Sequence, residues 1–117
     1  MAEKGTLPIT DDFMKEMLTR TRPYSVMLLY RTPAFDEPSS PAIVWEHGRR
    51  NFHLRAEGTL AIVVPISEDG SRVVGLGIFN ASVEETTRIM RDDPGVKAGI
   101  FTFEVRGGRS FPGDALP

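Results

Sequence analysis

The pattern of apolar residues divides the chain into strand-like and helix-like segments. Runs rich in Val, Ile, Leu, Tyr and Phe predict strands. Apolar residues spaced three and four apart, next to capping residues, predict helices. The expected strands span residues 24–32, 60–67, 72–80 and 99–106, and the expected helices span about 11–20, 41–57 and 83–92.

Capping residues set the ends of the two longer helices. Ser40 followed by Pro41 predicts a helix start, with a capping hydroxyl and a proline at the first helical position. Gly58 is the natural stop of the same helix. Ser82 and Glu85 form a capping box, which predicts the start of the next helix.

The order of these elements predicts the fold class. It is strand–helix–strand twice, and a hairpin joins the second strand to the third. With right-handed crossovers, this order gives an α+β, ferredoxin-like βαββαβ fold: a four-stranded antiparallel sheet with both helices on one face. We expect an arm with a short helix over 1–23, the domain over 24–106 and a tail over 107–117.

The expected strands are apolar on both faces, whereas a sheet with one wet face alternates apolar and polar residues. In the first strand, Val26 and Leu28 lie on one face, and Met27 and Leu29 on the other. Two helices cover only one face, so the second face is a larger apolar surface than soluble monomers normally expose. This favours an isologous homodimer. Cover by the chain's own amino-terminal helix and tail is the alternative.

Composition and charge exclude several classes of protein. The chain has 117 residues, with 14 basic and 16 acidic side chains, so no nucleic-acid partner is expected. Cysteine is absent, which excludes disulfides, zinc–thiolate sites and cysteine nucleophiles. The longest apolar run, Leu60–Val64, is far shorter than the roughly 20 residues that cross a membrane. With no signal segment either, we expect a cytoplasmic protein without a membrane partner.

His47 is the first candidate for chemistry, because imidazole exchanges protons near neutral pH. It shares a helical stripe with Val44, Asn51 and Leu54. A second apolar stripe on this helix contains Trp45, Phe52 and Ala56, and the pattern does not fix which stripe faces the sheet. Spacing alone leaves two interpretations: a core histidine satisfied by one hydrogen bond, or a general acid or base. His53 is expected to face solvent, and the two histidines are six positions apart rather than four, which excludes a helical metal pair. We expect no metal ion and no cofactor.

Asp92 and Asp93 end the third expected helix, where Pro94-Gly95 turns the chain. Two carboxylates near a helix C-terminus oppose the helix dipole, so something must offset their charge. Local hydrogen bonding in an Asx-type turn would do so. A partner cation such as a protonated histidine would also serve.

The remaining polar motifs are weaker. Gly75-x-Gly77 lies inside a strand and no helix follows it closely, so it is not a nucleotide-binding loop. Arg49 and Arg50 are expected to be two solvated charges on a helix face.

Five motifs follow one another along the chain. They are Leu29–Pro33, His47 eleven residues before Gly58, Leu60–Pro65, Ser82–Glu85, and Asp93–Gly99. Together they resemble the YCII-related proteins of the dimeric α/β-barrel superfamily, over about Tyr24 to Gly113. The Asp-Pro turn is the most specific of them. The sequence departs from the family pattern at Val64, which replaces a glycine, and at Gly48 and Asn51, which replace larger apolar residues.

The resemblance implies a dimeric α/β barrel with a cleft beside each sheet, and a catalytic pair formed by His47 and Asp93. A carboxylate that binds one ring nitrogen fixes the tautomer and leaves the other nitrogen free for a proton. The function this favours is cofactor-independent proton transfer, as isomerisation or elimination, on a small, aromatic or quinone-like molecule. The alternative is a non-catalytic small-molecule-binding or accessory domain in which the pair is structural.

Overall fold

Two compact units make up the chain in the computed structural model, which describes residues 7–117. The larger unit is Pro23–Gly108, and the smaller one consists of Met1–Arg22 with Arg109–Pro117. The first six residues of the expected amino-terminal arm lie outside the described residues. All the residues discussed as a candidate site belong to the larger unit.

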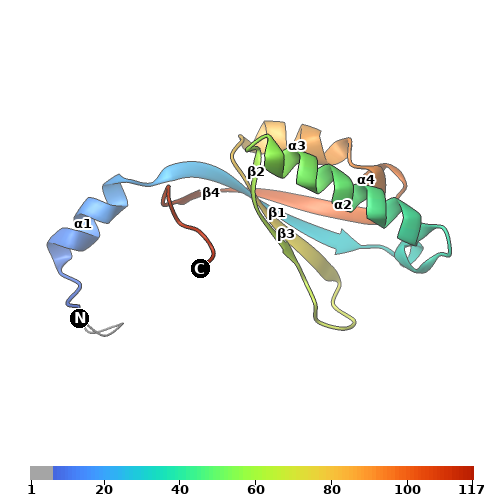
Figure 1. The fold of residues 1–117 in the computed structure, drawn as a ribbon, viewed down its shortest axis with the longest axis horizontal. Helices are drawn as coiled ribbons and strands as arrows, with labels where there is room; N and C mark the ends of the chain where they lie inside the picture. Colours follow the sequence, from blue (N-terminus) through green and yellow to red (C-terminus); the bar gives the residue numbers. More distant parts are fainter. Residues whose placement is uncertain (1–6) are drawn as a thin grey trace. The chain divides into compact units, whose positions relative to one another are not determined.

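The helices and strands follow the predicted order (Figure 1). The short helix α1 (Asp11–Thr19) is capped by Thr10, whose hydroxyl oxygen accepts from the Phe13 N–H. The later elements are β1 (Arg22–Arg31), the 3-10 helix η1 (Pro33–Asp36), α2 (Ser40–Ala56), β2 (Leu60–Pro65), β3 (Val73–Phe79), α3 (Val83–Arg91), α4 (Pro94–Lys97) and β4 (Phe101–Ser110).

The strands form one four-stranded sheet in the order β2-β3-β1-β4. Strand β3 pairs antiparallel with both β1 and β2. Figure 1 shows α2, α3 and α4 together on one side of this sheet. This arrangement is the ferredoxin-like α+β fold that the element order predicts.

The core lies between these helices and the sheet. Its buried apolar residues are Met27, Leu29, Leu54, Leu60, Phe79, Met90, Ile100 and Phe101. Core side chains lie close to the backbone at Gly77, where a Cβ would be 3.0 Å from the Phe79 ring and 3.1 Å from Leu60. We conclude that no larger residue fits at that point of β3 without repacking its neighbours.

The second face of the sheet carries two rows of aliphatic residues. The register aligns Val26 with Ile78 and Ile62 in one row, and Leu28 with Leu76 and Val64 in the other. None of the six belongs to the buried core, and Val64 is 37% exposed. The apolar second face predicted from the strands is therefore present.

Two local expectations differ from the structure. Ser40 does not cap α2: the helix begins at Ser40 after the N-cap residue Ser39, and the Ser40 hydroxyl donates to the Ala34 carbonyl at 2.6 Å. The cause is η1, which folds back and brings that carbonyl within reach. Strand β4 also runs four residues past the expected end at 106, and a Cβ on its Gly108 would lie 3.7 Å from Val26 of β1.

Candidate functional site

Helix α2 places His47 against the core. The stripe that contains His47 and Leu54 faces inward, whereas the second apolar stripe, with Trp45 and Phe52, is exposed. The His47 side chain is 12% exposed, and its ring centroid lies 4.9 Å from that of Phe101. The sequence alone did not decide which stripe faces the sheet. His53, on the same helix, is exposed as expected.

Asp93 is fully buried between α3 and α4, where it is the N-cap of α4. Its Oδ2 accepts from the Gly95 N–H at 2.9 Å and from the Val96 N–H at 3.2 Å. Pro94 favours this position, since it biases the preceding residue toward the extended backbone that Asp93 adopts, with φ -64° and ψ 134°. The Asx-type turn predicted as one way to offset the carboxylate charge is thus present.

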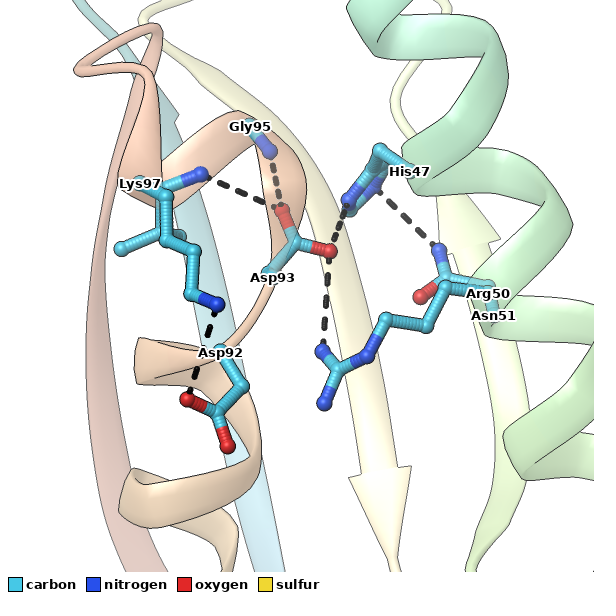
Figure 2. A network of polar contacts seen from close by, with 8 residues as sticks. His47, Arg50, Asn51, Asp92, Asp93, Gly95 and Lys97 are labelled. Atoms are coloured by element: carbon cyan, nitrogen blue, oxygen red, sulfur yellow. Dashed lines mark hydrogen bonds and ion pairs between the residues drawn. The ribbon is translucent and has the colours of Figure 1, made fainter.

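The other oxygen of Asp93 meets His47, as Figure 2 shows. His47 Nδ1 lies 2.7 Å from Asp93 Oδ1. An ionised carboxylate only accepts hydrogen bonds, so Nδ1 carries the proton and donates it. The Asx-type turn and a hydrogen bond from the histidine therefore occur together at Asp93. The contact between residues 46 positions apart is the one that the sequence analysis expected.

The second ring nitrogen is not free, and this expectation was wrong. Asn51 lies one helical turn after His47, and its amide nitrogen is 3.3 Å from His47 Nε2. With the proton on Nδ1, the lone pair of Nε2 faces the amide and accepts a hydrogen bond from it. Helix geometry is the reason, because residues four apart share one face of a helix. The same spacing is visible in the sequence, which places Asn51 on the helical stripe of His47 without predicting a hydrogen bond between them.

Arg50 joins His47, Asn51 and Asp93 in one group of polar side chains, contrary to the expectation that it is solvated. Its Nη1 lies 3.8 Å from Asp93 Oδ1, and its side chain is 26% exposed. Arg49 behaves as expected, with 58% exposure and an ion pair to Glu46 at 3.0 Å. Successive helical residues point about 100° apart, so only one of the two arginines faces the core. Arg50 lies three residues after His47, and this spacing is the signal in the sequence that places both side chains on the same face of the helix.

Neighbouring charges stay outside this group. Asp92 is 73% exposed, and its Oδ1 lies 4.0 Å from Lys97 Nζ. In the described part of the chain, no three His, Asp or Glu side chains come close enough together to hold a metal ion. Nor is any helix of residues 7–117 long and apolar enough to cross a membrane.

The fold and the polar group together define an α+β, ferredoxin-like protein with a buried His–Asp pair between two helices. No model of a known protein family matches the sequence, and no curated protein matches it either. Among solved structures, the chain is similar to 5-chloro-2-hydroxyhydroquinone dehydrochlorinase from Burkholderia phenoliruptrix AC1100, solved in complex with 2,5-dihydroxybenzoquinone. The two are 21% identical, with a TM-score of 0.44, and the match covers 69% of this chain and 90% of that one.

Proposed function

We propose that His47 transfers protons on a small organic molecule, with Asp93 as the residue that orients it. The observation that carries the proposal is the 2.7 Å hydrogen bond between His47 Nδ1 and a carboxylate that is itself held by two backbone amides. A ring fixed in this way has one defined tautomer, in which Nε2 carries the lone pair. Orientation by a buried carboxylate is how histidine bases are commonly positioned in enzymes.

The proposed step needs only the groups of this chain and the substrate. His47 Nε2 takes a proton from a carbon next to a carbonyl, and the electrons of the broken C–H bond move into the enolate. The imidazolium then returns the proton to a different carbon, which is an isomerisation. Alternatively, the enolate expels an anionic leaving group, which is an elimination, and His47 passes its proton to water. In both cases Asp93 stays ionised and keeps the ring in place.

Asn51 has to move before this step. Its amide donates to the lone pair that would accept the substrate proton, at 3.3 Å. A single hydrogen bond of this kind is worth about 0.5–1.5 kcal/mol. Rotation of the Asn51 side chain therefore exposes Nε2 at a small cost.

A second candidate function is favoured by the same contacts. Asp93 joins α2 to α4 through His47 and caps α4 with its other oxygen. A clasp of this kind stabilises a binding or accessory domain that does no chemistry. In that case the hydrogen bond between Asn51 and His47 Nε2 is permanent. The two candidates differ in whether His47 is needed for proton exchange.

Hydrogen–deuterium exchange at carbon tests the two candidates. A panel of small carbon acids, including 2-oxo acids and hydroxyquinones, is incubated with the protein in D₂O and followed by proton NMR. We expect the wild type to accelerate exchange of at least one compound, and His47→Gln to slow it by about 10²-fold or more. His53→Gln, which changes the exposed histidine of the same helix, is the matched control and should exchange at the wild-type rate.

Two results would refute the catalytic proposal. One is a wild type that accelerates exchange of no compound in the panel. The other is a His47→Gln variant that retains the wild-type rate. Loss of stability in His47→Gln without any exchange activity in the wild type is the outcome that the clasp predicts.

A homodimer and membership of the YCII-related family also remain proposals. The support for the dimer is the second sheet face, where two cross-strand rows of aliphatic residues lie opposite the helices. The same face of a second copy would cover them with two-fold symmetry. The five sequence motifs support the family. Size-exclusion chromatography with light scattering should give the mass of two chains, and the mass of one chain would contradict the dimer.

A further inference from the structure

Arg50 differs from the surface arginines of the chain in its surroundings. Its Nη1 is shielded from solvent and has no hydrogen-bond acceptor among the residues that the structure describes. Buried donors without an acceptor are uncommon, because each costs about 1–3 kcal/mol and more when the group is charged. Arg49, the preceding residue, has both solvent and the Glu46 carboxylate as partners. The cost of burying Arg50 therefore calls for an explanation.

Asp93 compensates the charge of Arg50 but does not accept a hydrogen bond from its Nη1. The carboxylate already accepts from His47, Gly95 and Val96, all at 3.2 Å or less. Arg50 Nη1 lies outside these donors at 3.8 Å, which is an ion-pair distance and too long for a hydrogen bond. The positive charge near His47 is thus held in place while its Nη1 donor has no acceptor. Figure 2 shows Arg50 and His47 approaching the same Asp93 oxygen from α2.

We propose that Arg50 binds an oxyanion of the molecule on which His47 acts. This inference rests on the proposed function and adds the class of ligand: an acid whose negative charge lies on oxygen, as in a carboxylate, phenolate or enolate. The guanidinium fork suits such a group, since its parallel N–H bonds match two oxygen lone pairs. The side chain as a whole is 26% exposed while Nη1 is shielded, so binding at Nη1 requires the side chain to shift.

The proposal also fits the charges of the proton-transfer step. With neutral His47, the charges of Asp93 and Arg50 cancel. When His47 takes a proton, the group gains one positive charge, and the substrate gains one negative charge on its oxygen. A cation already fixed beside the base stabilises that oxygen as its charge develops. Arg50 would then contact the substrate, whereas Asp93 acts only through His47.

Benzoate is the probe for this inference, because it carries an oxyanion and has no proton for His47 to remove. It is titrated into ¹⁵N-labelled full-length protein at constant ionic strength, while the side-chain Nε–Hε signals of the arginines are followed. We expect benzoate to shift the Arg50 signal and leave the Arg49 signal unchanged. Arg50→Gln should weaken binding at least tenfold, and Arg49→Gln is the matched control with an unchanged Kd. The neutral analogue benzamide should not bind to the wild type, to Arg50→Gln or to Arg49→Gln.

Arg50→Lys keeps the charge and loses the fork, so its Kd should lie between those of the wild type and Arg50→Gln. It also replaces Arg50→Gln in the test if that variant does not fold. The inference is overturned if benzoate leaves the Arg50 signal of the wild type unchanged, or if Arg50→Gln binds as tightly as the wild type. Benzoate binding at Arg50 without any carbon-proton exchange would leave the inference standing and refute the proposed function. Carbon-proton exchange that depends on His47 and not on Arg50 would support the proposed function and refute the inference about Arg50.

Discussion

Replacing Asp93 with alanine should destabilise the protein far more than an ordinary substitution of an acidic residue. The change removes the acceptor of three N–H groups, those of Gly95, Val96 and His47. Loss of an N-cap side chain costs about 0.5–2 kcal/mol. Leaving the His47 N–H buried without an acceptor costs about 1–3 kcal/mol more. We therefore expect Asp93→Ala to lower the free energy of unfolding by about 1.5–5 kcal/mol.

Asp93→Asn separates stability from orientation of the ring. The asparagine oxygen still accepts from the two amides of α4, while its NH₂ group faces His47 Nδ1. The ring then has to accept at Nδ1 and carry its proton on Nε2. A neutral hydrogen bond replaces a charge-assisted one, which costs about 1 kcal/mol. The variant should therefore stay folded and lose the acceptor that the proposed chemistry needs.

Urea unfolding followed by far-ultraviolet circular dichroism measures both variants. The free energy of unfolding is obtained by linear extrapolation to zero urea, with the slope compared between variants. Asp92→Ala is the matched control, because the adjacent carboxylate is 73% exposed and should change stability by less than about 0.5 kcal/mol. The reasoning fails if Asp93→Ala is as stable as Asp92→Ala, or if Asp93→Asn is as damaging as Asp93→Ala.

Three further substitutions test other parts of the account. Gly95→Ala would place a Cβ in steric conflict with the Phe101 ring, so it should cost about 1–3 kcal/mol in urea unfolding, and unchanged stability would contradict this packing. Asn51→Ala removes the hydrogen bond to His47 Nε2, worth about 0.5–1.5 kcal/mol, so His47-dependent proton exchange should rise about two- to tenfold. A slower rate would show that Asn51 assists the step. Leu76→Arg places a charge between Leu28 and Val64 on the second sheet face, so light scattering should give the mass of one chain instead of two. A variant that still has the mass of two chains would show that the interface lies elsewhere.

The fold was predictable because its signals are local. Strand composition, the capping hydroxyl of Ser82 and the glycine at Gly58 mark the elements, and their order leaves few possible topologies. In the structure, Ser82 accepts from the Glu85 N–H, and Gly58 adopts a positive φ of 79°. Ser40 was assigned wrongly because its partner, the Ala34 carbonyl, is brought to it by a 3-10 helix that the sequence did not reveal.

The candidate site was predictable only in part. His47 and Asp93 stand out in motifs, and their contact follows from two helices on one sheet face. Arg50 and Asn51 were missed, although they lie three and four residues after His47. The sequence does not tell which side of a helix is buried when two stripes are apolar, and a pair of adjacent arginines is usually solvated. Once the stripe of His47 is known to face the core, both residues follow from helix geometry.

The tautomer of His47 is the most direct test of the proposed function. Two-bond proton–nitrogen correlation NMR on ¹⁵N-labelled protein, at a pH where the ring is neutral, distinguishes a protonated Nδ1 from a protonated Nε2. The hydrogen bond to Asp93 predicts that Nδ1 carries the proton and Nε2 the lone pair, and that Asp93→Asn reverses this assignment. A wild-type ring protonated on Nε2 would show that Asp93 does not orient His47 as a base, and would contradict the account.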